Sequence, residues 1–195
     1  MRIGVTGIFA SGKGTVCGMF EKLGAVVIDT DVIAREIMLP GSDGLLEVTR
    51  EFGDSFLNAD GTLKRRELAD FVFGDAEKVK RLNEITHPII NKHLMERSSG
   101  DGFFMLNVPL LFETGLDKSM DANIVVKAKN EQAIERGILR DNISENEIKA
   151  RLLHQIPLKE KASLADYVID NSGSMENTER QVVDIWNILK ADREM

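Results

Sequence analysis

The residues with the clearest chemistry lie in a glycine-rich stretch near the start of the chain, Gly7-Ile-Phe-Ala-Ser-Gly-Lys-Gly-Thr15. Glycines allow successive backbone N–H groups to point into one hollow, and Lys13 can reach the β- and γ-phosphates of a nucleotide. An apolar, β-branched segment precedes the stretch at 2–6, and apolar residues at helical spacing follow it at 16–23. A strand, a glycine loop and the positive end of a helix together predict a site for a nucleoside triphosphate or another polyphosphate.

The loop departs from the strict phosphate-loop pattern at one position. The pattern places Ser or Thr directly after the lysine, where the hydroxyl binds Mg²⁺. Here Gly14 takes that place and Thr15 follows it. This Gly-Lys-Gly-Thr variant resembles the loop of adenylate-kinase-type enzymes. Because the phosphate cradle is built from backbone groups, we expect it to survive the change, whereas a direct hydroxyl ligand to Mg²⁺ comes into question.

Two aspartates, Asp29 and Asp31, end the second apolar run of the chain. At the carboxyl end of a strand beside the phosphate loop, Asp31 could accept a proton from an attacking hydroxyl or hold water around Mg²⁺. Asp31 could equally cap the helix expected at 32–38, because aspartate is a preferred N-cap residue. The sequence by itself leaves these two interpretations even.

Arg136 and Arg140 lie four residues apart on one face of an expected helix. Paired guanidinium groups can clamp a phosphoryl group during transfer. The spacing alone favours a solvated helix face with acidic neighbours such as Glu135 and Asp141, because such charge pairs are common.

Two further residues could contact a substrate. His87 precedes Pro88 inside a helical pattern; it could touch substrate, although a lone histidine is more often structural. Glu113 follows the third apolar run, from which it could reach the site or cap the short segment after it.

The elements that must position these residues alternate between strands and helices. Short, nearly continuous apolar runs predict strands, at 2–6, 25–29, 103–108, 122–127 and 166–170. Runs of this kind, separated by helical patterns, indicate a parallel sheet covered on both faces. We therefore predict a three-layer α/β fold with a five-stranded parallel sheet and a ligand site at the carboxyl ends of the strands.

Two segments are too long for simple crossovers. The segment 32–99 contains no good strand, and helical patterns fill it at about 43–53, 64–73 and 76–97. The segment 131–161 carries charged helices, one of which begins at the capping box Ser144-Glu-Asn-Glu147. A final helix at 175–191 should pack on the core through one side that carries Val182, Val183, Ile185, Trp186 and Leu189, and the tail 191–195 is expected to fray.

Composition limits the classes of function. The formal net charge of -7 argues against nucleic acid as the main partner, because a basic footprint is missing. The chain has no apolar run long enough to span a bilayer and no secretory signal before the first strand. Its single cysteine, Cys17, cannot form an intrachain disulfide. We therefore expect a cytoplasmic protein, and nothing in the sequence indicates an obligate protein partner.

Motifs along the chain resemble those of bacterial dephospho-coenzyme A kinases over about residues 2–190. After the phosphate loop come, in the family's order, Ile28-Asp-Thr-Asp31 with Ile33-Ala-Arg35, Gly61-Thr-Leu-Lys-Arg-Arg66, His87-Pro88, Val108-Pro-Leu-Leu-Phe-Glu113, Arg136 with Arg140-Asp141, Gln155, and Ala165-Asp-Tyr-Val-Ile-Asp-Asn-Ser-Gly173. The order of the motifs is more specific than any one of them. Most members of the family read Gly-Gly-Ile-Gly-Ser-Gly-Lys-Ser-Thr in the loop, so Ile8, Phe9, Ala10 and Gly14 are departures.

The resemblance implies a kinase that moves the γ-phosphoryl group of ATP, with Mg²⁺, onto the ribose 3′-hydroxyl of dephospho-coenzyme A. The implied fold is a phosphate-loop NTPase fold like that of nucleoside monophosphate kinases. The whole chain, 1–195, would form a single kinase domain with a core (about 1–31, 100–130 and 162–195), a helical substrate-binding insertion (about 32–99) and a lid (about 131–161).

The family's functional residues transfer to this chain by position. The ATP phosphates would be held by Lys13 and by the backbone of Ala10, Ser11, Gly12, Gly14 and Thr15, with Asn171 and Gly173 near the adenine. Asp31 would be the base and would orient the hydroxyl, and the resemblance favours this role over the capping interpretation. Arg140 of the lid would be a catalytic residue together with Lys13 and Asp31. Substrate would meet Asp31, Arg66, His87, Glu113 and Arg136. Thr15 and Asp31 would hold Mg²⁺ through water.

Two alternative functions can be distinguished from a dephospho-coenzyme A kinase. A nucleoside monophosphate kinase is favoured only by the Gly-Lys-Gly-Thr variant, and its acceptor would distinguish it. A nucleotide switch of the GTPase type needs an Asn-Lys-x-Asp signature after a strand. Asn91-Lys92 is followed by His93-Leu94 inside a helical pattern, so that signature is missing.

Overall fold

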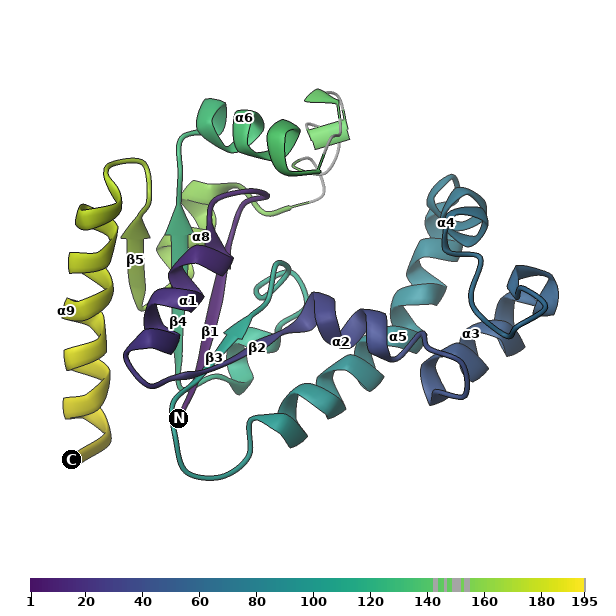
Figure 1. The fold of residues 1–195 in the computed structure, drawn as a ribbon, viewed down its shortest axis with the longest axis horizontal. Helices are drawn as coiled ribbons and strands as arrows, with labels where there is room; N and C mark the ends of the chain where they lie inside the picture. The colour runs from purple at the N-terminus through teal and green to yellow at the C-terminus, as the bar shows by residue number, and fades with distance from the viewer. Residues whose placement is uncertain (142–143, 146, 149–151, 153–154, 195) are drawn as a thin grey trace. The chain divides into compact units, whose positions relative to one another are not determined.

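A computed structural model describes residues 1–141, 144–145, 147–148, 152 and 155–194, with the backbone alone at 140 and 141. The chain forms two compact units. One unit comprises Met1–Ile28 and Gly100–Met195, and the other comprises Asp29–Ser99. The helices and strands of both are labelled in Figure 1.

A five-stranded parallel sheet forms the centre of the first unit, as predicted. Its strands are β1 (Arg2–Gly7), β2 (Val26–Asp29), β3 (Phe104–Asn107), β4 (Ala122–Lys127) and β5 (Tyr167–Asp170). Their order is β2-β3-β1-β4-β5, so β1 lies in the middle and pairs in parallel with both β3 and β4. The loop that follows β1 therefore leaves the carboxyl edge at the centre of the sheet, where ligands of such folds bind.

Two helices cover one face of this sheet, α1 (Lys13–Lys22) and α9 (Met175–Glu194). Phe20 of α1 and Trp186 of α9 are buried with their ring centroids 6.2 Å apart. Two expectations for the last helix were wrong. Val183 is 42% exposed and does not join the core, and the tail expected to fray is helical as far as Glu194.

The alternation of side chains along β1 divides them between the two faces. Ile3 and Val5 pack into the core shared with α1 and α9. Gly4 faces the other way, where a Cβ atom would lie only 2.7 Å from a methyl group of Leu111. That second face is covered by the segment after β3, which includes η2 (Leu116–Ser119), and by α8 (Leu158–Leu164). Helix α6 (Asn130–Asp141) follows β4.

The regular elements of the segment 30–99 are helices, as the absence of strand patterns predicted, and one isolated antiparallel β-bridge joins Leu57 to Leu63. The elements of this second unit are α2 (Thr30–Glu36), α3 (Asp43–Phe52), η1 (Asp54–Phe56), α4 (Arg65–Phe73) and α5 (Ala76–Arg97). Side-chain caps fix two helix starts: Ser42 accepts a hydrogen bond from Leu45 N, and Asp75 accepts from Glu77 N. Helix α5 continues through Pro88.

The capping box predicted at Ser144 is confirmed. Ser144 N donates to the Glu147 carboxylate at 2.8 Å, and Glu147 N donates to Ser144 Oγ at 3.3 Å. Within the described part of the chain, no helix is both long enough and apolar enough to cross a membrane.

Candidate active site

The loop between β1 and α1 has a backbone that requires small residues at Gly7, Ala10 and Gly12. Ala10 and Gly12 both have left-handed backbones, with φ of 55° and 93°. A Cβ atom on Gly7 would collide with the carbonyl oxygen of Val126 in β4. Ser11 is fully buried, and its hydroxyl has no hydrogen-bond partner among the described residues. Left-handed residues in such a turn aim successive N–H groups into one concavity, as an anion site requires.

Lys13 is half-buried at the start of α1 and reaches back across the loop. Its Nζ atom donates to the carbonyl oxygens of Gly7 at 3.3 Å and Ile8 at 3.1 Å. These contacts hold the ammonium group over the loop. The assignment of Lys13 to nucleotide phosphates stays a prediction.

The first turn of α1 contains Gly14, where the loop departs from the strict phosphate-loop pattern, and Thr15, which follows it. Gly14 is helical, and a Cβ atom there would have no heavy atom within 4 Å. Thr15 is exposed, so its hydroxyl is accessible to solvent and ligands. The N–H groups of this turn have no partners within the helix and carry its positive dipole end.

Asn171, directly after β5, is tied to the phosphate loop. Its buried side-chain amide donates to Ser11 O at 2.9 Å, and its Oδ1 accepts from Thr178 Oγ1 at 3.1 Å. Gly173 is exposed two residues later. Thr178 was missed by the sequence analysis because one threonine in an amphipathic helix gives no signal of its own.

Helix α6 is attached to the same loop after β5. Arg136 donates to Asn171 O at 3.3 Å, and Gln132 donates to Ser172 O at 3.2 Å. Arg136 is half-buried, so the solvated-face interpretation that spacing favoured is wrong for this residue. The backbone of Arg140 lies in α6, but its side chain falls outside the described part of the structure, and the clamp with Arg136 stays a prediction.

The phosphate loop also packs against α6 through Phe9. A Cβ atom on Gly137 would lie 2.7 Å from the Phe9 ring, so glycine permits this close contact. The aromatic ring is one of the departures from the family's usual loop sequence. Phe9 therefore links the phosphate loop to the helix that carries Arg136.

Glu113 is part of a buried ion pair that the sequence did not reveal. Its Oε1 atom lies 2.8 Å from Nζ of Lys161, whose side chain is 0% exposed, and it also accepts from Ile156 N at 2.9 Å. Nothing in the sequence distinguishes Lys161 from the exposed Lys159 in the same short helix. Among the described residues, Oε2 of Glu113 has no hydrogen-bond partner.

The structure corrects the expectation for the two aspartates. Strand β2 ends at Asp29, and α2 begins at Thr30 rather than after Asp31. Asp29 is the N-cap: its Oδ1 accepts from Asp31 N at 2.7 Å. Asp31 is exposed in the first turn of the helix, so the proposal that it caps α2 is wrong.

Arg66 and His87 lie in the helical unit. Arg66 is exposed on α4. His87 is half-buried on α5 and lines a hollow of about 660 Å³ with Lys80, Asn83 and other residues of that helix. Burial lowers the pKa of His87 below its ordinary value, because desolvation disfavours the charged imidazolium. Arg66 does not line this hollow.

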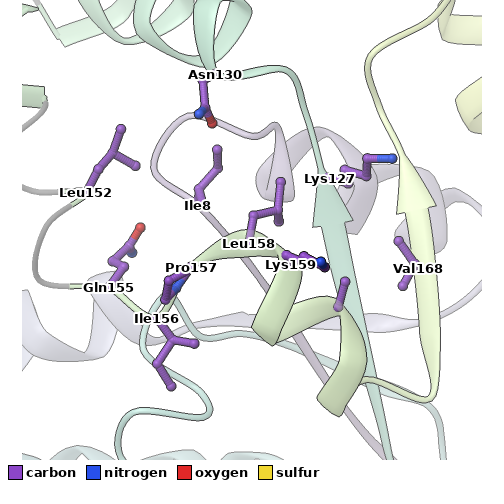
Figure 2. A pocket seen from close by; sticks show the side chains of 11 residues that line it. Ile8, Lys127, Asn130, Leu152, Gln155, Ile156, Pro157, Leu158, Lys159 and Val168 are labelled. Carbon is purple, nitrogen blue, oxygen red and sulfur yellow. The ribbon is translucent and has the colours of Figure 1, made fainter.

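A larger cavity, of about 840 Å³, opens beside the start of the phosphate loop. Apolar residues, which include Leu158 of α8 and Val168 of β5, line it together with Ile8, Lys127, Asn130, Gln155 and Lys159 (Figure 2). No group of three or more His, Cys, Asp or Glu side chains in the described residues is placed to hold a metal ion.

Comparison with known proteins decides the family. A sequence model of the dephospho-CoA kinase family matches residues 1–177. A dephospho-CoA kinase from Listeria monocytogenes is 40% identical over 185 residues, which cover 92% of both chains. The chain belongs to the dephospho-CoA kinase family.

Solved structures agree with this membership. A protein from Thermus thermophilus is 33% identical, with a TM-score of 0.84 and 97% of both chains covered. A dephospho-CoA kinase from Campylobacter jejuni is 28% identical, with a TM-score of 0.72 and 98% of both chains covered.

The resemblance and the phosphate-loop NTPase fold expected from the sequence are therefore confirmed. The protein is a kinase with ATP as co-substrate, and membership of the dephospho-CoA kinase family favours that acceptor over a nucleoside monophosphate.

Proposed function

We propose that this protein transfers the γ-phosphoryl group of ATP to the ribose 3′-hydroxyl of dephospho-CoA, which yields CoA and ADP in the last step of CoA synthesis. The ribose oxygen forms a bond to the γ-phosphorus, the bond from that phosphorus to the bridging β-γ oxygen breaks, and the hydroxyl proton passes to a base. The observation that carries the proposal is the loop with left-handed Ala10 and Gly12 and with Lys13 held across it, in a chain of this family.

The loop supplies the charge that the transferred phosphoryl group needs. We assign the ATP phosphates to the backbone of residues 10–15 and to the Lys13 ammonium group, which would exchange its carbonyl contacts for phosphate oxygens. The Ser11 hydroxyl, which has no hydrogen-bond partner among the described residues, and the positive end of α1 suit an anion.

The adenine is assigned to the loop after β5. Asn171 is fixed by Ser11 and Thr178, and Gly173 is exposed beside it without a side chain to obstruct a flat base. Arg136, bonded to Asn171 O, would border this site and direct its charge toward the phosphates.

The acceptor hydroxyl is assigned to Asp31. Because Asp29 already caps α2, the exposed Asp31 carboxylate is not needed to start that helix and can act as a base. Arg66, His87 and Glu113 are assigned to acceptor binding. For Glu113 this role falls to Oε2, since Oε1 is used by Lys161 and Ile156.

Mg²⁺ fits this donor set only through water and phosphate. Gly14 has no side-chain oxygen, whereas the exposed Thr15 hydroxyl and the Asp31 carboxylate are oxygen donors of the kind that orient magnesium-bound water. When bound, the ion would neutralise charge on the β- and γ-phosphates.

We also assign roles to the two long segments that lie between strands. We assign acceptor binding to the helical segment 32–99, and a lid that brings Arg140 to the phosphates to 131–161, within one kinase domain. ATP and dephospho-CoA are the partners in this proposal, and we place the enzyme in the cytoplasm.

The test is a coupled ADP-release assay with ATP, Mg²⁺ and a panel of acceptors. We expect turnover with dephospho-CoA and little with AMP or other nucleoside monophosphates. Faster turnover with a monophosphate would favour the alternative acceptor.

A further inference from the structure

Gln155 makes a contact with the phosphate loop that the reaction described above does not use. Its Oε1 atom accepts a hydrogen bond of 3.1 Å from the backbone N–H of Phe9. Phe9 directly precedes Ala10, whose left-handed φ of 55° is unfavourable for a residue with a Cβ atom. A fixed residue on the N-terminal side of Ala10 would help to keep that turn from relaxing.

The residue that follows Gln155 is anchored in turn. Ile156 N donates to Glu113 Oε1 at 2.9 Å, and the same oxygen pairs with the Lys161 ammonium at 2.8 Å. Lys161 Nζ also donates to Pro109 O at 3.0 Å, and Thr6 of β1 donates to this carbonyl at 3.1 Å. These bonds connect residues 155 and 156 to the strand that leads into the phosphate loop.

Burial makes this anchor stiff. The Lys161 side chain is 0% exposed and that of Glu113 is 15% exposed, so neither charge can exchange its partner for water at low cost. A buried pair of this kind contributes little net stability, yet it opposes any arrangement that separates the charges. Its position directly beside Ile156 therefore restricts where Gln155 can lie.

We propose that Gln155 is a positioning residue for the phosphate loop, and that the Glu113–Lys161 pair acts on the loop through Gln155. The inference rests on the proposed function in one respect: it assumes that the loop binds the phosphates of ATP. A neutral amide suits the task, because it accepts the Phe9 N–H bond without placing a negative charge beside a polyphosphate. Figure 2 shows Gln155 and Ile8, the neighbour of Phe9, on the wall of one cavity.

The first test replaces Gln155 with Met, which keeps the length of the side chain and removes the acceptor. Calorimetry with ATP and with ADP, in the absence of any acceptor substrate, reports nucleotide affinity directly. We expect Gln155→Met to weaken both nucleotides about fivefold, as the loss of one net hydrogen bond predicts. The KM for dephospho-CoA should be unchanged, and the melting temperature should fall by no more than about 4 °C.

The opposite result would also be informative. If Phe9 N–H is needed by a phosphate oxygen, Gln155 competes with ATP, and Gln155→Met should bind ATP more tightly. Either tighter or unchanged ATP binding in a folded variant overturns the proposal. Wild-type protein that binds ATP but does not phosphorylate dephospho-CoA would instead contradict the proposed function and leave this inference standing.

The second test asks whether Lys161 acts through Gln155. Lys161→Met is compared with Lys190→Met, which changes an exposed lysine on α9. We expect Lys161→Met to weaken ATP binding several-fold and Lys190→Met to leave ATP affinity unchanged. If Lys161→Met does not fold, Glu113→Gln/Lys161→Met, which buries no unpaired charge, replaces it.

A double-mutant cycle tests whether Gln155 and Lys161 affect ATP affinity through the same contact. When Gln155→Met and Lys161→Met are combined, the loss of ATP affinity should be clearly smaller than the product of the two single losses, since both act on one contact. If the double variant loses as much ATP affinity as the product of the two single losses, Lys161 does not act through Gln155.

Discussion

The side-chain amide of Asn171 donates a hydrogen bond of 2.9 Å to the carbonyl oxygen of Ser11, 160 residues earlier in the chain. This bond joins the loop after β5 to the middle of the phosphate loop. It brings the amide so close to Gly12 that any Cβ atom on Gly12 would collide with it. The conformation of the loop and the position of the proposed adenine site are therefore coupled.

Gly12→Ala should disrupt both the phosphate loop and the proposed adenine site. The substitution adds a side chain at φ 93° and displaces Asn171, so we expect the free energy of unfolding to fall by about 1–2 kcal/mol or more and ATP affinity to drop at least about tenfold. Gly18→Ala is the control, because Gly18 is helical and a Cβ atom there has open space. It should stabilise the protein by about 0.5–1 kcal/mol. Equal effects of the two variants in urea denaturation would contradict the coupling.

Lys13→Ala should reduce turnover by about 100-fold or more while the protein stays folded. The ammonium group would stabilise charge on the phosphates as the bond to the leaving group breaks, and an uncharged methyl group cannot. Steady-state kinetics and circular dichroism measure the two quantities. A folded variant with near-normal turnover would show that the loop is not the catalytic phosphate site.

Asp31→Asn should lower kcat by about 100-fold or more with little change in ATP affinity, because an amide cannot accept the hydroxyl proton. Stability should change little, since Asp29 is the N-cap. Asp29→Ala is the matched control and should cost about 1 kcal/mol of stability through loss of the cap. An unchanged rate for Asp31→Asn would return Asp31 to a structural role.

Gly14→Ser should lower the Mg²⁺ concentration that gives half-maximal rate. The new hydroxyl can replace a water on the ion, and the site accepts it because Gly14 is helical with open space at Cβ. Helix propensity also favours serine slightly. The measurement is a Mg²⁺ titration of both proteins at fixed ATP, and an unchanged midpoint in the folded variant would argue against this account.

His87 should make stability depend on pH. Its pKa in the folded protein is below that of the unfolded chain, so the unfolded state binds the proton first as the pH falls. The free energy of unfolding should therefore decrease as the pH is lowered through about 6.5 and below, with no such contribution above that range. Urea denaturation at pH 7.5 and 5.5 should show a smaller decrease for His87→Gln than for the wild type. Equal decreases would assign the pH dependence to other groups.

The positions of most elements could be predicted from the sequence. Apolar runs of five or six residues predicted all five strands, and helical spacing predicted α3, α4 and α5 within about two residues. The end of β2 at Asp29 was predicted correctly, but the start of α2 was placed after Asp31 instead of at Thr30. Asp29 and Asp31 both follow an apolar run, and only the backbone distinguishes the residue that caps α2. Val183 was assigned to the core because its neighbours on α9 are buried, although it points to solvent.

The sequence by itself determined the phosphate loop, the order of strands and helices, and the family. These depend on local patterns, such as glycines before a lysine and apolar periodicity, that residues close in the chain impose on one another. Tertiary structure alone decided which distant side chains meet: Asn171 with Ser11, Gln155 with Phe9, and Glu113 with Lys161. Such pairs form because a parallel sheet gathers the ends of strands that are far apart in sequence, and a buried polar group must then find its partner there.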